Sequence, residues 1–290
     1  MIDYDYIRPG SVKEAIGLLR QYGSKAAVIA GGTDVMVNIR NRNMAPELLV
    51  SIRDLKDLCY IKKDENYHIG SLTTHRMLEN SDLVKGELSA LNDGASWVGS
   101  VQVRNVGTIG GNIVNAAPSA DTAGPLLALG ASVILEGAEG VRKIPISEFF
   151  TGPSRTAKRD DEILLEFEIP GEMENFGSAY WKHSRRKAMN LPLVGVSVAL
   201  KLGASDVIED AGIALTVAAP TPVRAGMAED FMKGKPLSEE VLSEAGRIAA
   251  SPDCCSPRDS LRCDAWYREE MIAVLVPRVA RLAADRIKNR

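Results

Sequence analysis

The chain has 290 residues, of which 45% are hydrophobic, and this is enough for about two domains with buried cores. Its formal net charge of −3 argues against a nucleic-acid partner, and no apolar stretch approaches the roughly 20 residues that span a bilayer. The first residues lack the basic and apolar regions of a secretory signal, which predicts a cytoplasmic protein without a membrane partner.

The N-terminal part predicts a helix and a strand that lead into a glycine pair. A capping box at Ser11 precedes an amphipathic helix that ends at Gly23, and a short apolar strand follows over 26–30. The strand runs into the sequence Ala-Gly-Gly-Thr-Asp over 30–34. Glycine lets backbone N–H groups approach a ligand closely, so this layout is typical of phosphate-binding loops. Neither GxGxxG nor GxxxxGK[ST] occurs, so the phosphate must be held in another way.

A second glycine run over 107–121 follows strands expected at 48–52 and 67–70 and helices expected at 74–80 and 83–97. Two glycine-rich turns from distant parts of the chain predict a ligand with two phosphates, such as a dinucleotide, held between subdomains. A glycine pair alone is more often a requirement of a turn, and Asp34 could simply cap the segment after the first turn.

The remaining elements predict an α+β organisation. A short helix is expected at 125–130 and strands at 132–136 and 163–169; three strands then follow at 178–183, 193–202 and 212–219, and three helices at 224–233, 238–250 and 266–288. Strands followed by helices without alternation indicate a separate α+β unit. We therefore expect domains over 1–173, with subdomains of about 1–55 and 56–173, and over 174–290.

The ordered motifs resemble the FAD-binding subunit of the molybdenum hydroxylases, most closely that of bacterial xanthine dehydrogenases. The segments that carry the resemblance are 30–34, 102–112, 120–121, 149–153, 162–165, 182–186, 218–224 and 262–268. The resemblance implies a two-subdomain FAD-binding domain of the vanillyl-alcohol-oxidase (PCMH) type. It also implies a C-terminal domain of the CO dehydrogenase flavoprotein type, with a three-stranded sheet plus helices.

The resemblance also implies the residues that contact FAD. They are Val28, Ile29, Ala30, Gly31, Gly32, Thr33 and Asp34 in a first loop and Thr108, Ile109, Gly110, Gly111 and Asn112 in a second. Asp121 would accept hydrogen bonds from sugar hydroxyls, Leu164 would be an apolar contact, and Lys182 would lie near the flavin ring. Lys182 could instead be a solvated strand residue. Asn190 stands where the family commonly carries aspartate.

No residue of this chain is expected to be catalytic or to bind metal, and Cys59, Cys254, Cys255 and Cys263 fit structural thiols. The chain offers no cysteine sets for iron–sulfur clusters, so we expect 2Fe-2S clusters on a small partner subunit and molybdopterin on a large one. FAD here would collect electrons and pass them to NAD⁺ or another acceptor. The alternatives are a stand-alone FAD-dependent oxidoreductase of the same fold and a non-redox nucleotide-binding module.

Overall fold

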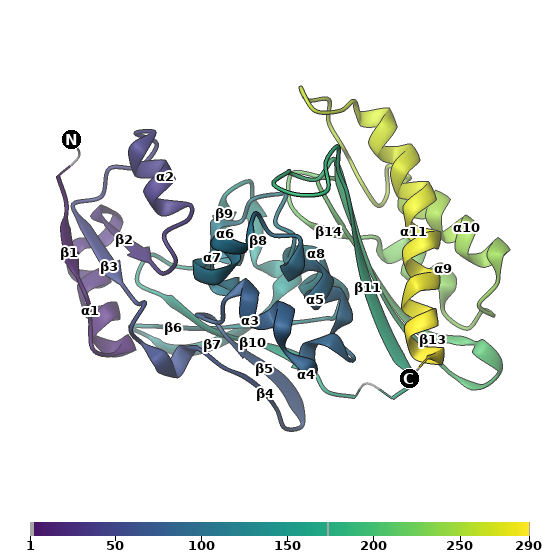
Figure 1. Cartoon of the computed structure of the whole chain (residues 1–290), viewed down its shortest axis with the longest axis horizontal. Coiled ribbons are helices and arrows are strands. Elements are labelled where there is room, and N and C mark those ends of the chain that lie inside the picture. The colour runs from purple at the N-terminus through teal and green to yellow at the C-terminus, as the bar shows by residue number, and fades with distance from the viewer. Residues whose placement is uncertain (1–2, 173, 290) are drawn as a thin grey trace.

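The computed structural model describes residues 3–172 and 174–289; residue 173, at the expected domain boundary, lies outside them. Three β-sheets follow one another along the longest axis of the molecule, with the N-terminus at one end and helix α11 at the other (Figure 1). Within the described residues, no helix is both long enough and apolar enough to cross a membrane.

The N-terminal sheet is parallel and carries the first glycine run at the end of one strand. Its strands lie in the order β1 (Asp5–Ile7), β3 (Leu48–Ser51) and β2 (Ala26–Ile29), with helices α1 (Val12–Tyr22) and α2 (Val35–Arg40). The expected cap of α1 is confirmed, because Ser11 Oγ accepts a hydrogen bond of 3.1 Å from the Glu14 N–H. Helix α1 buries Ala15 and Leu19 against the sheet, so the amphipathic pattern predicted this packing correctly.

The middle sheet is antiparallel and is covered by six helices. Its strands lie in the order β4 (Ile61–Lys63), β5 (Asn66–Gly70), β10 (Ile163–Pro170), β6 (Ser132–Gly137) and β7 (Gly140–Pro145). The helices are α3 (His75–Asn80), α4 (Asp82–Lys85), α5 (Ser89–Ser96), α6 (Val101–Val106), α7 (Ile109–Asn115) and α8 (Ala123–Ala128). A small hairpin of β8 (Phe150–Gly152) and β9 (Arg155–Thr156) follows β7, and 3-10 turns lie at Gly23–Lys25, Lys56–Leu58, Ile146–Glu148 and Ala204–Asp206.

Two expectations for the middle helices are wrong. The single helix expected at 83–97 is interrupted after Lys85, where Gly86 leaves the helical conformation, and it continues as α5. The second glycine run is the start of α7 rather than a turn, because Thr108 Oγ1 caps the helix by accepting from the Gly111 N–H at 3.1 Å. The low helix propensity of glycine conceals this helix in the sequence.

The C-terminal sheet is antiparallel and has four strands rather than the three expected. They are β11 (Phe176–His183), β12 (Val194–Leu202), β13 (Ile208–Thr216) and β14 (Val223–Arg224), followed by helices α9 (Gly226–Met232), α10 (Glu239–Ala249) and α11 (Ala265–Lys288). The two residues of β14 extend the sheet where the start of a helix was expected, so α9 begins two residues late. The α+β class is confirmed.

The C-terminal sheet lies between its own helices and those of the middle unit (Figure 1). Helices α9 to α11 cover its outer face, and α5 and α8 pack against its inner face. Arg286 in α11 crosses this junction. Its guanidinium binds both carboxylate oxygens of Asp93 in α5, at 2.7 and 3.0 Å, and the Ser178 carbonyl at 2.8 Å. The same Asp93 accepts from the Tyr180 N–H at 3.0 Å, so this ion pair helps to join the two units.

We expect Arg286→Leu to lower the free energy of unfolding by about 2 kcal/mol, because it leaves the Asp93 carboxylate and the Ser178 carbonyl without this partner. Arg281→Leu on the same helix is the matched control. It removes an exposed ion pair to Glu239 and should cost less than about 1 kcal/mol. Urea unfolding of both variants measures the difference, and equal losses would contradict the junction's importance.

Candidate functional site

The two glycine runs meet backbone to backbone at Gly31. A Cβ placed on Gly31 would lie 2.7 Å from the carbonyl carbon of Val106 and still closer to its oxygen. Both atoms are main chain and cannot rotate away, so only glycine allows the β2–α2 loop to contact the α6–α7 connection. The next residue, Gly32, has a φ of +73°, in the left-handed region that favours glycine.

The first loop presents a row of unpaired backbone donors. The N–H groups of residues 31 to 35 make no hydrogen bond to any described residue, and the first backbone bond of α2 is from Met36 N–H to the Gly32 carbonyl. Asp34 occupies the N-cap position of α2, but its side chain makes no capping bond, so the capping alternative for Asp34 is wrong. Successive free N–H groups in a glycine-containing loop suit an anion rich in acceptor oxygens.

The first loop also holds two polar side chains. Thr33 Oγ1 lies 3.5 Å from Asp34 Oδ2, and burial raises the pKa of the Asp34 carboxyl above its ordinary value. Val28 and Ile29 lie in strand β2 and pack against the neighbouring sheet residues, which places them behind the loop rather than at its open amides.

The second run differs, because its amides are already paired. The Ile109 and Gly110 N–H groups donate to the carbonyls of Thr73 and Ser71, each at 2.9 Å, while those of Gly111 and Asn112 are bonded within α7. A Cβ on Gly110 would lie 2.7 Å from the Ser71 main chain. The expectation that both runs offer amides to one ligand is therefore wrong for the second run, since packing against the turn 71–73 uses them. Side chains such as those of Thr108 and Asn112 remain its ligand groups in our prediction.

Asp121 and Lys182 form a buried ion pair across the junction of the two units. Lys182 Nζ lies 2.7 Å from Asp121 Oδ2 and donates to the Trp97 carbonyl, and the Tyr180 hydroxyl donates to Asp121 Oδ1 at 2.8 Å. Only 2% of the Lys182 side chain is exposed, so the alternative of a solvated lysine is wrong. Burial raises the pKa of Asp121 to about 6, although Lys182 and Tyr180 act in the opposite direction.

The predicted residues thus gather in two groups. Residues 28–34 and 108–112 lie around the contact between the glycine runs, and Asp121 lies with Lys182 at the junction of the two units. Leu164 is buried at a bulge of β10, in the same core as Ile109.

Sequence reasoning missed two residues near these groups. Tyr180 could have been found from its spacing, because Tyr180 and Lys182 lie two positions apart and share a face of β11. His75 is buried, and its backbone N–H donates to the Gly107 carbonyl at 3.1 Å, where the two glycine runs meet. No local pattern points to His75, because its position depends on the pairing of two distant segments.

The buried His75 gives the chain an expected sensitivity to acid. Burial lowers the pKa of His75 to about 4, with the Arg104 charge acting in the same direction. The unfolded chain binds a proton at this residue near pH 6.5, so the folded state loses stability as pH falls below that value. The loss between pH 6.5 and 5 should be about 2 kcal/mol, and urea unfolding across this range should show a smaller loss in His75→Leu. If the free energy of unfolding fell equally with pH in the wild type and in His75→Leu, His75 would not be the source of the acid sensitivity.

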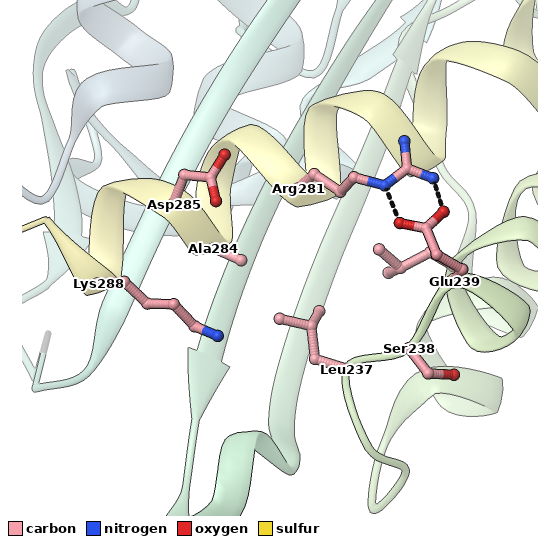
Figure 2. Close-up of a pocket in the computed structure, with 8 residues that line it drawn as sticks. Leu237, Ser238, Glu239, Arg281, Ala284, Asp285 and Lys288 are labelled. Carbon is pink, nitrogen blue, oxygen red and sulfur yellow. Dashed lines mark hydrogen bonds and ion pairs between the residues drawn. The ribbon is translucent and has the colours of Figure 1, made fainter.

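A groove between α10 and α11 contains none of the predicted site residues. Figure 2 shows that Arg281 and Glu239 pair across it, with Leu237 and Lys288 nearby. This pairing leaves no uncompensated charge at Arg281, and the groove belongs to the far side of the C-terminal unit from the glycine runs.

Comparisons with known proteins identify two matching families along the chain. Residues 2–172 match the family described as the FAD binding domain in molybdopterin dehydrogenase, and residues 179–283 match the CO dehydrogenase flavoprotein C-terminal domain. A xanthine dehydrogenase FAD-binding subunit of Escherichia coli O157:H7 is 35% identical over 283 residues, which are 96% of each chain. A nicotinate dehydrogenase FAD-subunit of Eubacterium barkeri is 35% identical over 247 residues, or 83% of each chain.

The solved structures support the same assignment. A chain of a carbon monoxide dehydrogenase from Hydrogenophaga pseudoflava superposes with a TM-score of 0.93 at 33% identity, covering 98% of both chains. The match extends over both units, including the four-stranded C-terminal sheet. The chain therefore belongs to the family of FAD-binding medium subunits of the molybdenum hydroxylases, which are oxidoreductases.

Proposed function

We propose that this chain is the electron-exit subunit of a multi-subunit molybdenum hydroxylase of the xanthine dehydrogenase type. A molybdopterin-binding large subunit oxidises the organic substrate, and a small subunit with 2Fe-2S clusters delivers the electrons. This chain would hold FAD, which would supply the route by which the electrons leave, with NAD⁺ as the first candidate acceptor. Medium chains of carbon monoxide dehydrogenases and the FAD subunit of xanthine dehydrogenase among the relatives support this division of labour.

The row of unpaired N–H groups at residues 31 to 35 carries the proposal for FAD, because a diphosphate offers the acceptor oxygens that these donors lack. The Thr33 hydroxyl adds a further donor beside them. The residues that we propose to form the FAD site are Val28, Ile29, Ala30, Gly31, Gly32, Thr33, Asp34, Thr108, Ile109, Gly110, Gly111, Asn112, Asp121, Leu164 and Lys182. Among them, Val28 and Ile29 support the first loop from behind, and the paired amides of Ile109, Gly110 and Gly111 position the second run.

Bound FAD supplies the conversion between one-electron input and two-electron output. The chain's own residues bind the cofactor and orient it. The first loop binds the diphosphate, and the contact of Gly31 with Val106 holds the two runs at a constant separation. The Asp121–Lys182 pair places a buried cation at the junction of the two units, where the Tyr180 hydroxyl holds the carboxylate in position. No side chain is required as a general acid or base toward the organic substrate.

The full chain reconstituted with FAD tests this proposal. We expect one FAD per chain, a visible flavin spectrum that bleaches with NADH under anaerobic conditions, and no hydroxylation of purines. Purification of the native protein should yield companion chains that contain molybdenum and iron. Failure to take up FAD would contradict the flavin site. Substrate oxidation by this chain alone, without companions, would favour a stand-alone oxidoreductase, and FAD that is never reduced would favour a nucleotide-binding module.

A further inference from the structure

His75 lies where the two glycine runs meet. It is the first residue of α3, and Thr74 caps this helix by accepting from the Met77 N–H. The imidazole Cδ2 is 3.4 Å from the point that a Cβ on Gly107 would occupy, and Thr33 Oγ1 is 3.7 Å from the same point. The imidazole and the Thr33 hydroxyl of the first loop therefore both lie beside Gly107.

The imidazole has no hydrogen-bond partner among the described residues. The Nδ1 atom is fully buried and unpaired, and Nε2, which is not among the fully buried unpaired atoms, makes no hydrogen bond to a described residue. The nearby Arg104 does not bind the ring, because its guanidinium donates to Glu79 and to the Val98 carbonyl. A buried nitrogen without a hydrogen-bond partner lowers the stability of the folded chain. Packing alone therefore does not explain a histidine at this position.

The ring is neutral near pH 7, since burial and the Arg104 charge both lower its pKa. A neutral imidazole has one N–H group and one acceptor nitrogen. A buried acceptor without a partner is tolerated better than a buried N–H, which assigns the proton to Nε2 and leaves Nδ1 as the unpaired acceptor. The Nε2–H then belongs to the ring nitrogen bonded to Cδ2, the carbon that lies near Gly107.

Several unpaired groups around this point are donors. The backbone N–H groups of residues 31 to 35 and the Nε2–H of His75 have no acceptor among the described residues. We propose that His75 Nε2 donates a hydrogen bond to the diphosphate of FAD and so forms a third binding element beside the two glycine runs. This inference rests on the proposed function, because it requires FAD to bind at the first loop.

Two substitutions in the full chain test the proposal. His75→Leu removes the donor and keeps an apolar side chain of moderate size, and we expect it to weaken FAD binding about tenfold. His75→Gln has a side-chain N–H that reaches a position near Nε2, and it should bind FAD within about threefold of the wild type. The phosphorus NMR spectrum of bound FAD should change in His75→Leu and stay near that of the wild type in His75→Gln.

The apo chain separates a ligand contact from a structural role. Leucine removes an unpaired buried nitrogen, so apo His75→Leu should melt at the same temperature as the wild type or higher while it binds FAD more weakly. His68→Leu is the matched control. His68 lies on the middle sheet and contacts Asp64 and Glu166, and its loss should leave FAD affinity and the phosphorus spectrum unchanged. Inorganic pyrophosphate, tested as a competitor, should bind less well to His75→Leu if the diphosphate alone is the recognised group.

The outcomes distinguish this inference from the proposed function. A wild-type chain that binds no FAD overturns both. Wild-type affinity and an unchanged phosphorus spectrum in His75→Leu overturn the role of His75 alone and leave the flavin site intact. The role of His75 is also overturned if apo His75→Leu loses stability as well as FAD affinity and His75→Gln restores neither. A residue that serves only packing would behave in that way.

Discussion

Gly31→Ala should destabilise the folded chain by about 3 kcal/mol and weaken FAD binding at least tenfold. The added Cβ would collide with the Val106 carbonyl, whose carbon lies 2.7 Å from the Cβ position. Because both partners are backbone, relief requires the first loop to move away from the α6–α7 connection. This movement disperses the row of free N–H groups that we propose to bind the diphosphate. Thermal unfolding of the apo chain and FAD titration measure the two effects separately.

Gly17→Ala is the matched control for this substitution. Gly17 lies within α1, and a Cβ there would have no atom within 4 Å. Alanine in an exposed helix interior is favoured over glycine by about 1 kcal/mol, so Gly17→Ala should raise stability and leave FAD affinity unchanged. Wild-type affinity and stability in Gly31→Ala would show that the two runs do not need their close contact.

Lys182→Met should lower the free energy of unfolding by about 3 to 5 kcal/mol at pH 8, because it leaves the buried Asp121 carboxylate without its cation. The pKa of Asp121 is already raised to about 6, and loss of Lys182 raises it further. A carboxyl whose folded pKa exceeds its unfolded pKa loses stability as pH rises between the two values. The defect of Lys182→Met should therefore be smaller at pH 5 than at pH 8, as urea unfolding at the two pH values can show.

The same substitution at Lys201 provides the control. Lys201 pairs with Glu209 at 3.4 Å on the surface of the same unit, and Lys201→Met should cost less than about 1 kcal/mol at either pH. The importance of the buried ion pair would be contradicted if Lys182→Met lost as little free energy of unfolding as Lys201→Met, or if its loss did not change with pH.

The helix caps and the spacing of hydrophobic residues show which elements can be predicted from local sequence. Ser11 predicts the start of α1 because its partner, the Glu14 N–H, is three residues away. The helical spacing of the buried residues in α11 likewise follows from the period of that element. Helix α7 was missed because its capping residue Thr108 precedes two glycines, and low propensity outweighed the cap.

The sequence by itself determined the α+β class and the glycine-rich motifs by which the family is identified, since each depends on residues close together in the chain. Only the tertiary structure decided which amides are free. The N–H groups of Ile109 and Gly110 in the second run donate to the turn 71–73, whereas those of residues 31 to 35 in the first loop have no partner among the described residues. It also decided that Lys182 reaches Asp121, 61 residues away. Hydrogen-bonding groups are satisfied by whatever packing brings near them, and that packing is set by contacts between distant segments.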